Sequence, residues 1–143
     1  MPHLVILYSA NLDARTDMSA LCRSLADTML AQRDDAGKPV FPPGGTRVLA
    51  YPAAHSAISD GGTAGRAAGG DGDYGFAYLN LRMGRGRSEA VHQAVGQALS
   101  AAAKAHFDPL MASMHMGVTV QIDVGAEVFD ARHSSLHPLF NRI

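Results

Sequence analysis

Cys22 is the only cysteine among the 143 residues of this chain. A single thiol excludes an intramolecular disulfide and every zinc site built mainly from cysteines. This usage favours a reducing compartment, and we expect a cytoplasmic protein. Because Cys22 shares an apolar helical stripe with Leu21 and Leu25, we interpret it as a small buried hydrophobic residue.

An excess of charge and long apolar runs are also missing. The formal net charge is −1, so nothing favours binding to nucleic acid or to an anionic membrane. No apolar run approaches transmembrane length, and residues 4–8 are too short for the core of a secretory signal. Hydrophobic residues make up 47% of the chain, which predicts one folded domain over residues 1–143.

Signals for a metal or a nucleotide are weak. Seven histidines occur, and none belongs to a spaced pair such as H-E-x-x-H, so we interpret them as surface or hydrogen-bonded residues. The segment 84–88 is glycine-rich but lacks the lysine and the spacing of a phosphate-binding loop. The sequence therefore predicts neither a metal ion nor a cofactor.

The order of elements is strand, helix, strand, repeated once. Helices are predicted from a cap at Thr16 or Asp17 to about residue 33, and from Ser88 to about residue 106. The predicted strands cover residues 4–8, 46–51, 74–83 and 116–124. A helix that joins two strands of one sheet favours parallel pairing within each half.

These elements predict an α/β (α+β) fold of two β-α-β units, with two helices on one face of a four-stranded sheet. The halves cover about residues 1–58 and 74–143. The uncovered face needs a partner, which indicates an oligomer. Segment 59–73 holds six of the fifteen glycines and is predicted to be a flexible loop. The apolar residues of the C-terminal end, above all Leu139 and Phe140, suit docking on another subunit.

Pro2 is the first candidate for chemistry. Removal of Met1 would expose its secondary amine at the start of a buried strand. An apolar environment or a nearby guanidinium disfavours the protonated amine and lowers its pKa. An amine that titrates near neutral pH can take a proton from one atom and return it to another.

Two arginines are candidates for binding a substrate. Arg47 follows the rigid Pro-Pro-Gly-Gly turn, and Arg87 directly precedes the second long helix. Guanidinium groups hold carboxylates through two parallel hydrogen bonds, and a helix N-terminus adds positive potential. A small-molecule carboxylate is therefore the expected substrate.

Several segments together carry a family resemblance. They are Met1-Pro2-His3-Leu4-Val5, 41–47, 73–77, Gly84-Arg85-Gly86-Arg87-Ser88, 104–111 and His137-Pro138-Leu139-Phe140. In this order, the chain resembles the 5-carboxymethyl-2-hydroxymuconate isomerase family of the tautomerase superfamily, nearly from end to end.

The resemblance implies a homotrimer of two β-α-β units and a cofactor-independent keto–enol isomerisation in the homoprotocatechuate pathway of aromatic catabolism. It implies that Pro2 is the catalytic base and that Arg47 and Arg87 bind substrate carboxylates. Members of the family can carry another arginine two positions beyond the first, where this chain has Leu49.

Two other functions stay open at this point. A hydratase or dehalogenase of the same fold, acting on unsaturated acids, would use a protonated Pro2 as an acid. A non-catalytic trimeric binding protein would be favoured if Met1 were retained, because the Pro2 nitrogen would then be an amide.

Overall fold

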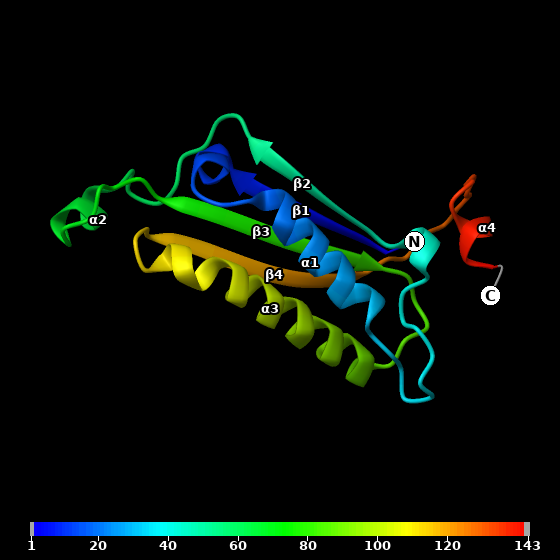
Figure 1. Ribbon diagram of the computed structural model, residues 1–143. Coiled ribbons are helices and arrows are strands. Elements are labelled where there is room, and N and C mark those ends of the chain that lie inside the picture. Colours follow the sequence, from blue (N-terminus) through cyan, green and yellow to red (C-terminus); the bar gives the residue numbers. More distant parts are fainter. Residues whose placement is uncertain (1, 142–143) are drawn as a thin grey trace.

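The computed structural model describes residues 2–141, so Met1, whose removal is expected above, lies outside the described residues. It consists of a four-stranded sheet with two long helices packed on one face (Figure 1). The strands are β1 (His3–Ser9), β2 (Arg47–Ala53), β3 (Gly75–Met83) and β4 (Met116–Val124). The long helices are α1 (Met18–Leu30) and α3 (Glu89–Met111).

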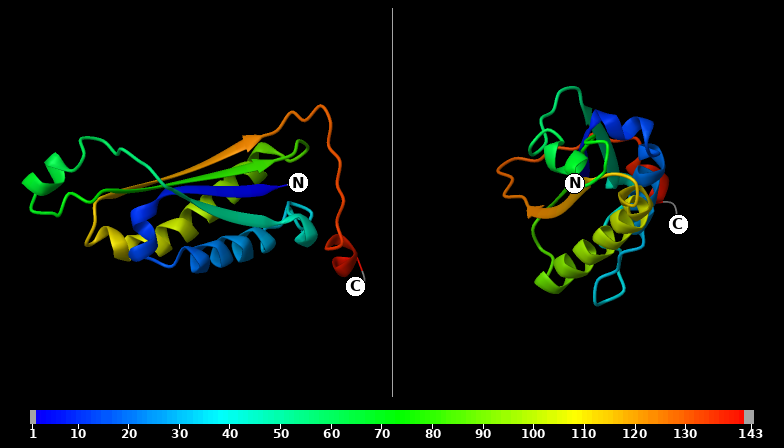
Figure 2. Two further views of the ribbon diagram at one scale, coloured as in Figure 1. Left: turned by 90° about the horizontal axis from the view of Figure 1, so that it is seen from above. Right: turned by 90° about the vertical axis from the view of Figure 1, so that its left-hand side faces the viewer.

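The sheet has the strand order β2-β1-β3-β4. β1 and β2 are parallel and are joined through α1, while β3 and β4 are parallel and are joined through α3. Antiparallel pairing of β1 with β3 connects the two halves. The predicted pair of β-α-β units is therefore confirmed, and both helices cover the same face of the sheet, as Figure 2 shows. Pro52 is tolerated in β2 because this strand is at the edge of the sheet.

Helix α1 is set by its cap and its apolar stripe. The Asp17 carboxylate accepts a hydrogen bond from the Ala20 N–H at 3.0 Å, which identifies Asp17 as the cap. Residues spaced three and four apart face the sheet and are buried: Met18, Leu21, Leu25 and Met29. Cys22 lies beside them but is only partly buried, and its burial raises the pKa of the thiol.

Helix α3 is longer than the sequence predicts. It begins after Ser88, whose hydroxyl accepts a hydrogen bond from the Val91 N–H, and it continues through Pro109 to Met111. Phe107 is fully buried on its inner face, which favours continuation of the helix past residue 106. Pro109 lacks the N–H that would bond to the Ala105 carbonyl, and α3 ends two residues later.

The core lies between the sheet and the two helices. Alternate residues of β1 and β3 point into it and are buried: Leu4, Ile6, Tyr8, Ala77, Leu79 and Leu81. The intervening residues of these strands face away from the helices, as period-two alternation requires. None of the helices within residues 2–141 combines the length and the apolar character needed to cross a membrane.

The opposite face of the sheet, called the open face below, has no helix over it (Figure 2). Its exposed apolar side chains come from three strands: Leu7, Leu49, Tyr51 and Phe76. Polar pairs cross it near β4, where the Tyr78 hydroxyl donates to Gln121 at 2.7 Å and the Asn80 amide donates to Asp123 at 2.9 Å. This face is therefore part apolar and part polar.

A projecting segment, residues 54–74, extends from one end of the molecule and is called the arm. It contains a short helix, α2 (Thr63–Ala67), in the glycine-rich stretch that is predicted from the sequence to be a flexible loop. The Asp60 carboxylate accepts hydrogen bonds from the N–H groups of Gly62 and Ala64, which supplies a cap for this turn. Arg15 holds the base of the arm through Asp71 and Asp73, at 3.0 and 2.9 Å.

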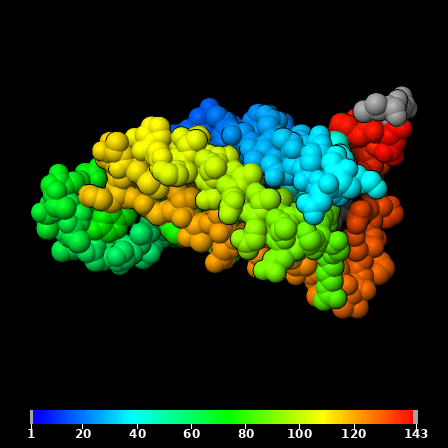
Figure 3. Space-filling model, turned by 90° about the horizontal axis from the view of Figure 1, so that it is seen from below, coloured from blue at the N-terminus to red at the C-terminus, as the bar shows by residue number. Residues whose placement is uncertain are grey.

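The C-terminal segment, residues 125–141, is called the tail and lies at the opposite end from the arm (Figure 3). It ends in α4 (His137–Phe140), which packs against the 3₁₀ turn η2 (Pro43–Gly45) of the same chain. Gly44 allows this approach, because a Cβ atom there would lie 2.7 Å from His137 Nδ1. Leu139 and Phe140 remain exposed, so apolar surface is still available after α4 has docked.

The close approach at Gly44 gives a testable prediction. A Gly44→Ala substitution is expected to displace α4 and to make the tail more sensitive to limited proteolysis. The melting temperature should change little, because no residue of α4 is buried.

Gly96→Ala is the matched control. A Cβ atom there would meet Ile122 Cδ1 at an ordinary 3.4 Å. This change should stabilise α3 by about 0.5–1 kcal/mol through helix propensity, without exposing the tail. Equal protease sensitivity in both variants would contradict the proposed contact.

Candidate active site

The residues that the sequence singles out lie at one end of the sheet, where β1 and β2 begin and β3 ends. Because β1 is antiparallel to β3, the start of β1 adjoins the end of β3, and His3 pairs with both Arg47 and Arg82. The turn that follows β3, residues 84–88, leads from this edge into α3. We call this end of the sheet the Pro2 edge, comprising Pro2, Arg47, Arg82 and residues 84–88.

Pro2 lies directly before β1 and is buried. By strand alternation it shares the helix-facing side with Leu4, whereas His3 belongs to the open face. Its position is fixed by the pairing of the next residue on both sides, to β2 and to β3. An amine at this nitrogen would therefore stand in a defined and partly dehydrated place.

Arg47 begins β2 directly after η2 and is half-buried. It lines a hollow of about 520 Å³ between α1 and the start of β2, which Phe140 of α4 also lines. Burial lowers the pKa of His3 below its ordinary value, and the charge of Arg47 lowers it further, while the Asp130 carboxylate of the tail acts in the opposite direction. The positive field of Arg47 thus reaches the residue next to Pro2.

Arg87 is half-buried where the turn leads into α3. Its Nη2 donates to the Val40 carbonyl at 2.7 Å, and its Nη1 donates to the Gly84 carbonyl at 3.5 Å. Part of this guanidinium therefore holds the start of α3 against the segment that precedes η2. The adjacent N-terminus of α3, capped by Ser88, adds positive potential at the same edge.

The three sequence-predicted residues are thus gathered at one edge, but their side chains have different neighbours within the single chain. Arg47 approaches from the β2 side of β1, and Arg87 approaches from the β3 side. Sequence reasoning missed Arg82, which shares the open face with His3. Alternation in residues 74–83 places Arg82 on that face, but only the antiparallel register reveals its neighbour.

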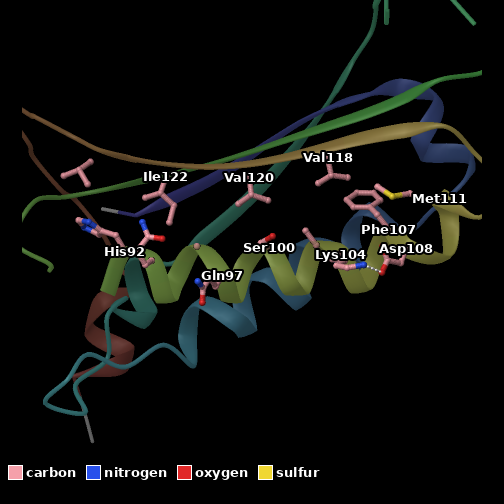
Figure 4. Close-up of a pocket in the computed structure, with 14 residues that line it drawn as sticks. His92, Gln97, Ser100, Lys104, Phe107, Asp108, Met111, Val118, Val120 and Ile122 are labelled. Carbon is pink, nitrogen blue, oxygen red and sulfur yellow. Dashed lines mark hydrogen bonds and ion pairs between the residues drawn. The ribbon is translucent and has the colours of Figure 1, made fainter. Parts of the chain in front are cut away.

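A second hollow, a groove of about 690 Å³, runs between α3 and β4 (Figure 4). Val118, Val120 and Ile122 form its sheet side, and polar residues of α3 form its rim. The charges of Lys104 and Asp108 are paired with each other at 2.6 Å. This groove therefore offers apolar surface and a lysine whose charge is already paired. The arginines that could bind a carboxylate lie at the Pro2 edge instead.

Comparison with known proteins points to one family. A model of the family "5-carboxymethyl-2-hydroxymuconate isomerase" matches residues 2–140. The chain is 25% identical to a 5-carboxymethyl-2-hydroxymuconate Delta-isomerase of Escherichia coli over 140 residues, which are 98% of this chain and 99% of the relative.

Two solved structures are similar along nearly the whole chain. A crystal structure of a 5-carboxymethyl-2-hydroxymuconate delta-isomerase is 66% identical, with a TM-score of 0.94 over 98% of this chain and 93% of that one. A 5-carboxymethyl-2-hydroxymuconate isomerase from Deinococcus radiodurans R1 is 27% identical, with a TM-score of 0.80 over 97% of this chain and 93% of that one.

The matches span the Pro2 edge, both β-α-β units and the tail as far as α4. The chain belongs to the 5-carboxymethyl-2-hydroxymuconate isomerase family.

Proposed function

We propose that this chain converts 5-carboxymethyl-2-hydroxymuconate, or a closely related carboxylated dienol, to its keto isomer, with the amine of Pro2 carrying the proton. The observation that supports this most is the register of β1. It places Pro2 between the start of β2, which carries Arg47, and the turn after β3, which carries Arg87.

The proposed reaction moves one proton. The neutral Pro2 nitrogen takes the proton of the 2-hydroxyl group, and the oxygen electron pair forms the carbonyl at C2. The double bonds shift along the diene, and C5 receives a proton from the protonated Pro2. Atoms and charge balance without a redox partner, so the protein needs only a proton carrier and groups that hold the substrate.

The arginines supply binding and electrostatic stabilisation in this proposal. Arg47 and Arg87 would anchor two carboxylates and stabilise the negative charge that develops on the oxygen at C2. The field of Arg47, which lowers the pKa of neighbouring His3, also disfavours a proton on an amine at Pro2. The same charges thus attract the substrate and favour the basic form of Pro2.

We further propose that three copies assemble through their open faces. Leu7 is 49% exposed and Tyr51 is 50% exposed on this face of the single chain. Burying such side chains against other copies is favourable by roughly 25 cal/mol per Å² of apolar surface. An assembly would also let a neighbouring subunit contribute a side chain to the Pro2 edge.

One prediction of the proposed function concerns Pro2. A Pro2→Ala variant keeps an amine but makes it primary, and we expect kcat/KM for the dienol to fall by about 10²-fold or more. Steady-state kinetics would measure this, and intact mass would establish that Met1 is absent from both proteins. Parent-level activity in the variant, or a native protein that retains Met1, would refute the role of Pro2.

Another prediction separates an isomerase from a hydratase or dehalogenase. A base must be neutral, so the pKa of the Pro2 nitrogen should be below that of an ordinary proline amine, and kcat/KM should rise with pH through the same value. Titration of ¹⁵N-labelled Pro2 by NMR measures this pKa directly. A Pro2 that stays protonated above the working pH would favour the acid role instead.

A further prediction tests the assembly. Sedimentation velocity of the wild-type protein should give three times the chain mass of 15.0 kDa. A Leu7→Asp change would place a charge at the centre of the open face, and we expect it to produce smaller species. Asp35→Ala, at an exposed position in the loop after α1, serves as the control. A monomeric wild-type protein would exclude the trimer.

A further inference from the structure

Arg82 is a cation at the Pro2 edge that the proposed proton transfer does not use. We infer that Arg82 binds a third carboxylate of the substrate and thereby selects a tricarboxylate over a dicarboxylate dienol. This inference rests on the proposed function. A muconate already carries two carboxylates, and a carboxymethyl substituent adds a third.

The sheet register places Arg82 close to the reacting end of the chain. His3 pairs with Arg47 on one side and with Arg82 on the other, so these three residues form one row across the open face. Neighbouring strands are about 4.8 Å apart, so the Cα atoms of the two arginines are separated by roughly 10 Å. Two cations at this separation suit a ligand whose carboxylates are at different ends.

The terminal nitrogens of Arg82 are available to bind a carboxylate. Its nearest ionic partner is Glu127 of the tail, with Nε 4.0 Å from Oε1, and the side chain of Arg82 is 59% exposed. Within residues 2–141, no hydrogen bond from its two terminal NH₂ groups is formed. By contrast, Arg15 contacts two carboxylates, and Arg87 donates to two backbone carbonyls.

The backbone beside Arg82 is built to hold it near the end of β4. The Gly125 N–H donates to the Met83 carbonyl at 2.8 Å, which fixes the chain where β4 ends. A Cβ atom on Gly125 would lie 3.1 Å from Arg82 Nε and would collide with the Glu127 carboxylate. Glycine at this position therefore leaves room for Arg82 and Glu127 over the strand end.

The distribution of charge on the open face points to the same residue. Leu49 follows Arg47 on this face of β2 and is apolar, and Asn80 precedes Arg82 on β3 and is neutral. Asp123 of β4 pairs with Arg82 across the strands, and its carboxylate accepts a hydrogen bond from the Asn80 amide at 2.9 Å. Arg82 is therefore the cation that β3 offers there, across His3 from Arg47. A substrate carboxylate can replace Glu127 as its partner, because the existing contact is long and exposed.

A test that varies both the protein and the substrate isolates this contact. We would measure kcat/KM of the wild type, R82Q and R47Q with two substrates. One is 5-carboxymethyl-2-hydroxymuconate, and the other is 2-hydroxymuconate, the same dienol without the carboxymethyl substituent. The kcat/KM of R82Q should fall roughly 10- to 100-fold with the tricarboxylate, mainly because KM rises. Its kcat/KM with the dicarboxylate should change little. R47Q should lose activity with both substrates.

R33Q removes an exposed positive charge from the loop after α1 and should leave both rates unchanged. R82K keeps the charge without the two-pronged geometry and should restore part of the loss. Equal losses of R82Q with both substrates, or no loss with either, would overturn the inference while leaving the proposed function intact. A wild-type protein that isomerises neither dienol would instead refute the proposed function itself, and this inference with it.

E127Q provides an independent measurement if R82Q does not fold. Removing the carboxylate that competes for Arg82 should lower KM for the tricarboxylate and leave KM for the dicarboxylate unchanged. An unchanged preference between the two substrates in E127Q would contradict the assignment.

Discussion

The antiparallel pairing of β1 with β3 is the constraint on which the other features depend. Each β-α-β half is parallel inside, so each half places the starts of its own two strands at one end. Antiparallel joining reverses one half against the other, and the start of β1 then meets the end of β3. Without this reversal, Pro2 and the turn at 84–88 would lie at opposite ends of the sheet.

Positive charge is concentrated at this edge in a chain whose net charge is close to zero. Arg47 acts on His3, Arg87 is anchored to the backbone near η2, and Arg82 has only a long contact with Glu127. Of these three arginines, Arg87 is held most firmly, through two backbone carbonyls, and Arg82 is held loosely. The firmly held arginine also supports the fold, whereas the loosely held one is free to respond to a ligand.

The sequence predicts the fold well because its signals are local. Alternation marks β4, a capping side chain marks α3, and the order of elements restricts the topology to two parallel units. The length of α3 and the presence of α2 are harder to predict, since they depend on the burial of Phe107 and on the hydrogen bonds of Asp60. The burial of Phe107 arises only when α3 packs on the sheet, whereas the Asp60 cap is local but lies in a glycine-rich stretch that favours a loop.

The candidate site is predicted only in part, for a related physical reason. Pro2 and Arg47 stand out by residue type and local context, so the sequence alone indicates them. Arg82 is hidden in an ordinary strand pattern, and its significance arises from pairing with a residue almost eighty positions away. The contact of Gly44 with His137 is equally invisible in the sequence, although it determines where the tail ends.

The repeated halves bear on how many candidate catalytic amines one chain can have. A pseudo-twofold axis relates β1-α1-β2 to β3-α3-β4, so the position that corresponds to the start of β1 is the start of β3, at the far end of the sheet. There the chain is continuous, and the Gly75 nitrogen is a peptide group that donates to the His115 carbonyl at 3.0 Å. A polypeptide has one amino terminus, so the symmetry of the fold cannot be a symmetry of the chemistry. Each chain can offer a single terminal amine, and the equivalent end is left free to carry the arm.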